Sequence, residues 1–414
     1  MTLKVGFGHT DLTPPLPFPL AGVVVKGGRE ATRVRDPLFA RAMAVCDGER
    51  TICLVSVDLL TFHGALSEAV RSEIAAAGVQ LEALLLTATH THSAPGGYWD
   101  TPSTVAFMGP PQRALFDHLV QGIAAAAITA AGDLRPARLA FGETAAPALN
   151  WNRRHPAGAI DDTVSVLRVE RDDGLHRVVS FGAHPVIVSE HDPLTASADF
   201  PGEIVRALSS DGGGAIYVSG SLGGVSPLWP DHVHDAEAHL ALVRDALLAR
   251  IRVAEAGATP VVGESVAGAT VVRRLKITTP RLFPSRWRLL DLVALPARLW
   301  LRRFMRRGLG EAPAAPVTVL RIGDLIIAGF PADMGPDVGL AARAVTSAAG
   351  YRLFAAASHS NDFVGYVHLP AAYEQPPTRG EDYAFMTIYE NAMAACGRDV
   401  GRGFVEQLRE ALSR

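Results

Sequence analysis

The sequence LEALLLTATHTHSAPGGYW, residues 81–99, joins an apolar run to a pair of histidines and a glycine-rich turn. A leucine-rich run of this length is typical of a buried β-strand. Because residues i and i+2 of an extended segment point the same way, His90 and His92 are predicted to face one site at the carboxyl end of this strand. Imidazole is a favoured zinc ligand, although a pair of hydrogen-bonded surface histidines is the simpler alternative.

The segments on either side of this strand alternate between strands and helices. Residues 41–60 predict two strands joined at Asp47-Gly48, and residues 66–78 have helical periodicity. The sequence PVTVLRIGDLIIAGFPAD, residues 316–333, predicts a hairpin that turns at Gly323-Asp324. Such interleaving predicts an α/β fold with layered mixed β-sheets flanked by helices.

Composition narrows the classes of function. The 414 residues carry a net charge of −3, so no nucleic-acid partner is predicted. The three cysteines form no CxxC pair, which argues against a disulfide framework and a cysteine-based zinc site. The first residues, MTLKVGFGHTDLTPP, contain no basic stretch followed by an apolar one. A cytoplasmic location is therefore predicted, or a secreted one if a leader has been removed.

One stretch differs in composition from the rest of the chain. The segment from Arg281 to Arg307 contains eight arginines and a single acid, Asp291, among large apolar residues. It reads as a basic amphipathic insertion at about residues 281–310, broken at Pro296. Such a segment can make peripheral contact with a membrane or cover an apolar substrate channel. The alternative is a surface helix pair docked on its own core.

Other strand-like segments also end at residues that can carry chemistry. His184 ends VVSFGAH, where Pro185 stops the ladder. Ser226 lies in the glycine-rich loop SGSLGGVSP as a nucleophile or substrate contact. Carboxylates that could complete a metal site are Asp58, Asp199 and Asp333. Hydroxyls that could bind a metal or donate to an oxyanion are those of Tyr366 and Tyr373.

Taken together and in this order, these segments resemble the neutral (alkaline, non-lysosomal) ceramidase family. The motifs that carry the resemblance are GFGHTDLTPP, THTHSAPGG, FGAHPV, GGVSP, PADMGPDVGL and NDFVGYVHLPAAY. They cover most of the chain. The resemblance implies a single neutral-ceramidase-like catalytic domain over residues 1–414. The sequence is similar to a short bacterial-type member of the family that lacks the C-terminal immunoglobulin-like domain.

The resemblance also implies an activity and a site. The family cleaves the amide bond of N-acylsphingosine with one Zn²⁺, so we expect a zinc-dependent amidohydrolase acting on a ceramide-like or other lipid-like N-acyl substrate through a zinc-activated water. The family's metal ligands fall on His90, His184, Asp333 and Tyr366. Its catalytic positions fall on His92 as the base, Tyr383 as a helper of the oxyanion, Arg153 as a substrate or oxyanion contact, and Ser226 as a group that positions the substrate.

The chain departs from the family pattern at two places. The family motif GDVSPN is replaced by GGVSPL, with Gly224 in place of an acid and Leu228 in place of an amide, and a family glutamate is shortened to Asp333. Two alternatives follow. One is a zinc amidohydrolase with a (β/α)8 barrel acting on a different small amide or ester, because HxH after an early strand also opens that superfamily. The other is a degenerate homologue that binds lipid without turnover.

Overall fold

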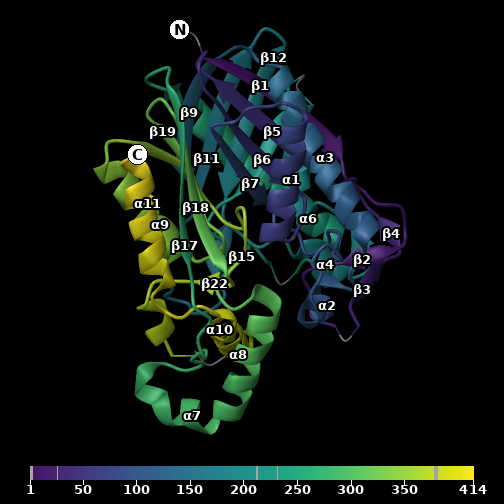
Figure 1. Cartoon of the computed structure of the whole chain (residues 1–414), viewed down its shortest axis with the longest axis vertical. Coiled ribbons are helices and arrows are strands. Elements are labelled where there is room, and N and C mark those ends of the chain that lie inside the picture. Colours follow the sequence, from purple (N-terminus) through teal and green to yellow (C-terminus); the bar gives the residue numbers. More distant parts are fainter. Residues whose placement is uncertain (1–2, 26, 211–212, 231, 377–380) are drawn as a thin grey trace.

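Three β-sheets of four or five strands form the body of the protein in the described part of the chain (Figure 1). The computed structural model describes residues 3–25, 27–210, 213–230, 232–376 and 381–414. The predicted α/β class, with layered mixed sheets flanked by helices, is confirmed.

Neighbouring strands in each sheet are hydrogen-bonded in an order that differs from their order along the chain. The first sheet has the order β7 (Ala83–Ala88), β6 (Thr51–Val57), β5 (Phe39–Cys46), β1 (Lys4–Asp11) and β8 (Arg135–Pro136). The second has the order β14 (Ala215–Ser219), β12 (Gly174–Phe181), β11 (Thr163–Arg171), β9 (Arg138–Ala145) and β16 (Thr259–Pro260). The third has the order β17 (Val266–Arg274), β18 (Ala314–Ile322), β19 (Leu325–Gly329) and β21 (Arg352–Ala357).

Short strands pair in the loops between these sheets. The pairs are β2 (Phe18–Leu20) with β3 (Arg29–Ala31), β4 (Arg33–Val34) with β13 (Thr195–Ala196), β10 (Asn150–Asn152) with β15 (Val225–Pro227), and β20 (Asp333–Met334) with β22 (Tyr366–Val367). The α-helices are α1 (Gly64–Ala76), α2 (Val105–Met108), α3 (Arg113–Gly132), α4 (Ile187–His191), α5 (Asp199–Ser209), α6 (Ala236–Ala256), α7 (Arg288–Val293), α8 (Leu295–Leu309), α9 (Pro336–Ala348), α10 (Glu381–Met393) and α11 (Val400–Leu412). Short 3₁₀ turns are η1 (Pro102–Thr104), η2 (Ser285–Trp287) and η3 (Ala372–Glu374).

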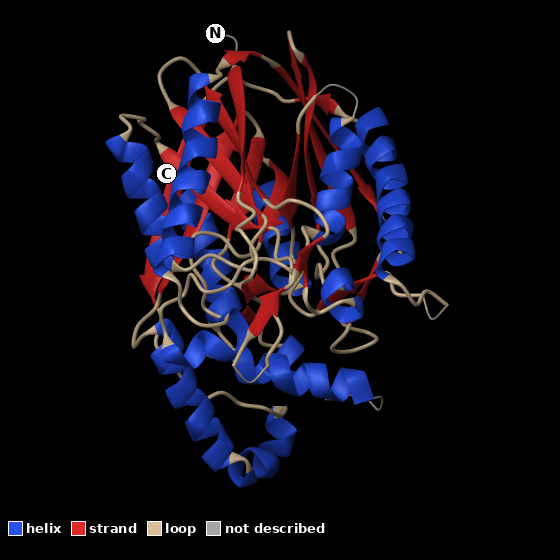
Figure 2. Ribbon diagram, turned by 90° about the vertical axis from the view of Figure 1, so that its right-hand side faces the viewer, coloured by secondary structure: helices blue, strands red, loops and turns tan. Residues whose placement is uncertain are grey.

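The inner faces of the three sheets share one apolar core. Leu85 of β7, Val218 of β14 and Ile327 of β19 are fully buried together in it. The outer face of each sheet is covered by helices: α1 and α3 on the first, α5 and α6 on the second, and α9 and α11 on the third (Figure 2). Strands buried on both faces explain the near-continuous apolar runs in the sequence.

Each sheet repeats one arrangement, in which antiparallel strands end on a single parallel pair at the sheet edge. The parallel pairs are β6 with β7, β12 with β14, and β19 with β21. Parallel strands of one pair end at the same edge of their sheet, where α/β proteins place their sites. The loops that follow β7, β12 and β21 carry the histidines described below.

The predicted turns are confirmed, and one alternative fold is wrong. The strands joined at Asp47-Gly48 are β5 and β6, and the hairpin that turns at Gly323-Asp324 is β18 and β19. Both glycines adopt positive φ, 103° at Gly48 and 56° at Gly323. A (β/α)8 barrel requires a closed parallel sheet, whereas each of these sheets is mixed and open. The barrel alternative is therefore incorrect.

Helix α3 packs unusually close to β1. By length and composition alone α3 could cross a membrane, but its apolar side lies against the first sheet as a core helix. A Cβ at Gly8 of β1 would lie 2.2 Å from the carbonyl oxygen of Ala126, and one at Gly6 would lie 2.0 Å from that of Ala130. Only glycine allows this separation between helix and strand.

We expect Gly8→Ala to lower the free energy of unfolding by about 1–3 kcal/mol, because the added methyl group forces α3 away from β1. Gly132→Ala is the matched control at the end of the same helix, where a Cβ meets no atom within 4 Å. It should leave stability unchanged or raise it by up to about 1 kcal/mol. Urea denaturation measures both, and a Gly8→Ala variant as stable as the wild type would contradict the close packing.

Candidate active site

His90 and His92 share one site. They do not lie in an extended strand, so the alternation of side chains that was expected to place them there is absent. Strand β7 ends at Ala88, before the pair. His90 instead adopts a left-handed backbone conformation with φ of 67°. Such strain is uncommon outside glycine and concentrates at functional sites. The resulting turn brings Nε2 of His90 within 3.2 Å of Nε2 of His92, which is half-buried.

His184, which lies shortly after β12, joins the same cluster with its ring held in one orientation. Its Nδ1 lies 2.9 Å from the carbonyl oxygen of Val225, and Nδ1 of His90 lies 2.7 Å from that of Leu60. A carbonyl oxygen only accepts, so both rings carry their proton on Nδ1 and turn the lone pair of Nε2 toward the site. Burial lowers the pKa of both rings, which are therefore neutral.

A short parallel ladder places Asp333 beside Tyr366. The two residues are direct partners in the pairing of β20 with β22. Oδ2 of Asp333 lies 3.7 Å from Nε2 of His90 and 3.5 Å from Nε2 of His184. The hydroxyl of Tyr366 lies 3.3 Å from Nε2 of His184. The structure thus brings together all four residues on which the family's ligand positions fall.

His359 belongs to the cluster and was not predicted. Its ring stacks on that of His90 with centroids 3.9 Å apart, and its Nε2 lies 3.8 Å from Oδ1 of Asp333. Like His90, it has a left-handed backbone, with φ of 52°. The sequence signal that indicates His359 is a histidine just after the apolar strand β21, the same pattern that His184 shows after β12.

The donor set fits a zinc ion. Tetrahedral bonds of about 2.0–2.1 Å place neighbouring ligand atoms about 3.3–3.4 Å apart. The distances from Nε2 of His184 to Tyr366 and Asp333, and from Nε2 of His90 to Asp333, are close to this, at 3.3, 3.5 and 3.7 Å. Oδ1 of Asp333 and Nε2 of His359 are buried without a hydrogen-bond partner among the described residues. Burial raises the pKa of Asp333, but the neighbouring imidazoles of His184, His359 and His90 outweigh it and hold the carboxyl in its anionic form.

Two overlapping groups can bind the ion. One consists of His90, His92 and His184, and the other of His90, Asp333 and His359. Within each group the ligand atoms lie within 4.8 Å of one another. His90 belongs to both groups, so it is the residue on which any metal site in this cluster depends.

Arg153 reaches the cluster from the end of β10. Its Nη2 donates to Nε2 of His184 at 2.9 Å and to the hydroxyl of Tyr366 at 3.0 Å. Its Nε donates to Oε1 of Glu390 at 3.1 Å. The lone pair of His184 cannot accept from Arg153 and bind a metal at once, so metal binding must break that hydrogen bond. Tyr366 and Glu390 remain as acceptors for the guanidinium group.

Glu390 of α10 supplies a carboxylate beside the glycine-rich loop and was also not predicted. A Cβ built on Gly224 would lie 3.0 Å from Oε2 of Glu390. The same oxygen accepts from Arg154 at 3.0 Å and lies 3.4 Å from Nε2 of His368. Burial raises the pKa of Glu390, but His368 and the two arginines outweigh it and lower it to about 2. A carboxylate from another element thus lies beside Gly224.

Ser226 and Tyr383 lie on either side of one aromatic residue. Ser226 is buried in β15 and pairs with Trp151 of β10, and the ring of Tyr383 meets that of Trp151 edge-on at 5.9 Å. Among the described residues, none forms a hydrogen bond with the hydroxyl of Ser226. A second tyrosine of α10, Tyr389, packs edge-on against Tyr366 at 5.9 Å, and burial raises its pKa to about 12.

The other candidates from the sequence have structural positions. Asp58 accepts hydrogen bonds from Arg41 and from the backbone of Phe39. Asp199 accepts from two backbone N–H groups at the start of α4 and α5, and burial raises its pKa to about 7. Of the three aspartates considered from the sequence, Asp333 alone lies in the histidine cluster.

Known proteins resemble this chain in sequence and in fold. Residues 3–197 match the family described as neutral/alkaline non-lysosomal ceramidase, N-terminal. This range includes His90, His92, Arg153 and His184, and it ends before the other residues of the cluster.

The whole chain superimposes on the neutral ceramidase from Pseudomonas aeruginosa with a TM-score of 0.80 at 20% identity, covering 74% of that chain. It also superimposes on a structure described as ceramidase complexed with C2, with a TM-score of 0.79 at 19% identity, covering 75% of that chain. Residues 3–197 thus match the N-terminal part of the neutral/alkaline ceramidase family, and the whole chain shares its fold with these ceramidase structures.

Proposed function

We propose that this protein is a zinc-dependent hydrolase that cleaves the amide bond of a lipid-like N-acyl substrate. The observation that carries the proposal is the pair of imidazoles of His90 and His184. Backbone carbonyls fix both rings with Nε2 toward a buried carboxylate and a tyrosine hydroxyl. Two neutral nitrogens and one anion match the donor types of catalytic zinc sites.

In this proposal His90, His184, Asp333 and Tyr366 hold the ion, and His359 orients the carboxylate of Asp333 from behind. Bound zinc supplies a Lewis acid that polarises the amide carbonyl and lowers the pKa of water. Outer partners such as His359 tune the affinity of the ligands that they contact.

The remaining residues move protons and orient the substrate. His92 is half-buried and neutral because burial lowers its pKa, so its ring can take a proton from the attacking water and pass it to the leaving amine. In this proposal Arg153 and Tyr383 donate to the oxygen on which negative charge develops. Glu390 holds Arg153 through a buried ion pair.

The proposal favours turnover over the degenerate lipid-binding alternative. That alternative was drawn from the loss of an acid at Gly224. The carboxylate of Glu390 lies beside this position, so the polar support of the loop is supplied from α10. A lipid-like substrate is supported by the family match and by the apolar segment that includes α7 and α8.

Metal content tests the ligand assignment. We expect His184→Ala and Asp333→Ala to lose both bound zinc and amide hydrolysis, because each removes a ligand. His92→Ala should keep zinc and lose about 10²–10⁴-fold in kcat, because it removes only the base. Elemental analysis of the purified proteins, with the exposed His234→Ala as control, measures the zinc. Full zinc content in His184→Ala would contradict the assignment.

Ser226→Ala distinguishes water attack from a serine nucleophile. We expect kcat to fall by no more than about tenfold, whereas loss of a true nucleophile costs about 10⁶-fold. The reason is that no base lies within hydrogen-bond distance of this hydroxyl among the described residues, and a serine needs one to attack. Mass spectrometry of the enzyme during turnover is the second measurement, and a covalent acyl group on Ser226 would overturn the proposal.

Tyr383→Phe tests the proposed oxyanion donor. Loss of one such donor should lower kcat by about 10²–10³-fold with little change in KM, since the bond forms in the transition state. Tyr389→Phe is the matched variant on the same helix. Steady-state kinetics on a soluble N-acyl amide compare the two variants, and a larger loss in Tyr389→Phe would transfer the role to that residue.

A further inference from the structure

Helices α7 and α8 form a hairpin that projects from the end of the molecule (Figures 1 and 2). The predicted break at Pro296 is confirmed, since α7 ends at Val293 and Pro296 lies in the first turn of α8. The outer side of the hairpin is apolar, with Val293 82% and Trp300 63% exposed. Its other exposed apolar residues are Leu289, Leu290, Leu292, Leu295 and Leu299.

The inner side of the hairpin is firmly attached to the body. Met305 is buried against Ile277 and Ala395 in a small core of its own. Asp291 is buried and accepts from the backbone N–H of Leu282 at 2.9 Å. The exposed residues therefore lie on the outer side of an ordered element. The expectation that the whole segment is docked on its own core holds for the inner side alone.

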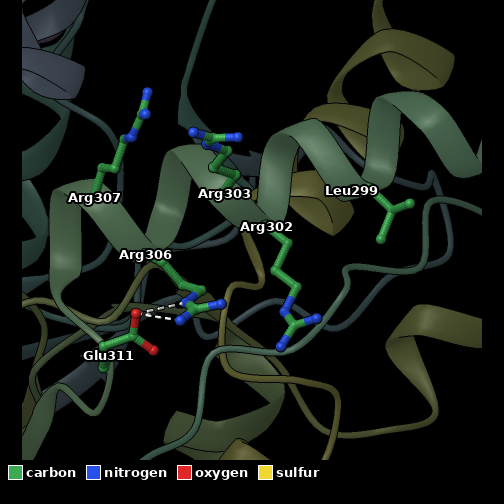
Figure 3. A pocket seen from close by; sticks show the side chains of 6 residues that line it. All are labelled: Leu299, Arg302, Arg303, Arg306, Arg307 and Glu311. Atoms are coloured by element: carbon green, nitrogen blue, oxygen red, sulfur yellow. Dashed lines mark hydrogen bonds and ion pairs between the residues drawn. The ribbon is translucent and has the colours of Figure 1, made fainter.

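Arginines surround this apolar surface. Figure 3 shows Arg302, Arg303, Arg306 and Arg307 lining one recess of α8 together with Leu299 and Glu311. Arg306 is paired with Glu311, with its Nε 2.9 Å from Oε1. Within the described ranges, no salt bridge involves the following hairpin arginines: Arg286, Arg288, Arg302, Arg303 and Arg307. The hairpin thus presents unpaired positive charge next to exposed apolar side chains.

We propose that the α7–α8 hairpin docks on an anionic membrane surface. The exposed leucines, Val293 and Trp300 enter the boundary between head groups and acyl chains, while the arginines bind lipid phosphates. Water is a poor environment for so large an apolar surface, and an amphipathic helix with a basic rim is the form that lies in a membrane interface. A second copy of the chain is a poorer occupant, because it would bring two sets of unpaired arginines together.

The hairpin is also joined to the loop that follows the site histidines. Nε1 of Trp99 donates to the carbonyl oxygen of Gly308 in α8 at 3.2 Å. A second recess lies between this loop and α8, lined by residues of both elements, among them Thr101, Ser103, Trp300 and Phe304. A docked hairpin would hold this recess at the lipid surface. The inference rests on the proposed function only because a lipid-like substrate would explain why the protein binds a membrane. The binding itself requires no hydrolysis.

Vesicle flotation without any substrate tests the proposal. The wild-type protein should bind phosphatidylcholine vesicles that contain phosphatidylglycerol, bind pure phosphatidylcholine weakly, and release as salt is added. The triple variant Arg302→Glu, Arg303→Glu, Arg307→Glu should lose at least about tenfold in partitioning to the anionic vesicles. Leu292→Ser, Val293→Ser, Trp300→Ser together should lose about as much, because the apolar anchor is removed.

Two matched controls separate the hairpin from general charge and apolarity. Reversing three exposed arginines elsewhere, Arg138, Arg252 and Arg409, changes the net charge equally and should leave vesicle binding near the wild-type level. Replacing three exposed valines elsewhere, Val253, Val262 and Val272, by serine should do the same. Circular dichroism and zinc content verify that every variant is folded and loaded.

Three outcomes would overturn the proposal. They are equal binding to both vesicle types, equal loss in a control triple, and a dimer in sedimentation that the apolar variant dissociates. Because the assay contains no amide substrate, absence of hydrolysis would count against the proposed function and leave the docking result intact.

Discussion

Two hydrogen bonds from imidazole to backbone determine what the centre of this protein can do. The carbonyls of Leu60 and Val225 hold the Nδ1 protons of His90 and His184, so both rings turn an unprotonated Nε2 inward. The neutral rings and the buried carboxylate of Asp333 together offer the types of donor that a metal cation binds. The carbonyl of Leu60 lies in the loop after β6, and that of Val225 lies in β15, which follows β14 in the chain, so the arrangement depends on segments that leave two different sheets.

The charges around that centre are balanced over several elements. Arg153 brings a buried positive charge next to the imidazoles. Glu390 of α10 forms buried ion pairs with both Arg153 and Arg154. Removing one partner of such a buried pair leaves an uncompensated charge, which is far more costly than losing a surface pair. The glycine-rich loop has no acid at Gly224, but the carboxylate of Glu390 from a distant part of the chain lies beside that position.

The hairpin of α7 and α8 differs from the helices that cover the sheets, because much of its apolar side is exposed. The helices that cover the sheets turn their apolar side toward them, as α3 does against β1. On α8 the buried residue Met305 faces the body while Trp300 faces outward. Its hydrogen bond with Trp99 connects this surface to the loop that leaves the histidine pair. The hairpin and the histidine cluster are thus connected through one loop, although they consist of separate groups of residues.

Local patterns in the sequence determined the strands and the turns at Gly48 and Gly323, since periodicity and turn chemistry act over a few residues. The four residues on which the family's metal ligand positions fall were implied by the resemblance to the neutral ceramidase family. Tertiary structure alone decided the rest. His90 and His359 stack because both adopt left-handed backbone conformations that no local pattern announces. Glu390 reaches Arg153 across more than half of the chain. The outer side of α8 is exposed because no sheet covers it. The sequence alone could not decide this, because an apolar stripe on a helix is equally consistent with a buried core position and with a lipid-binding surface.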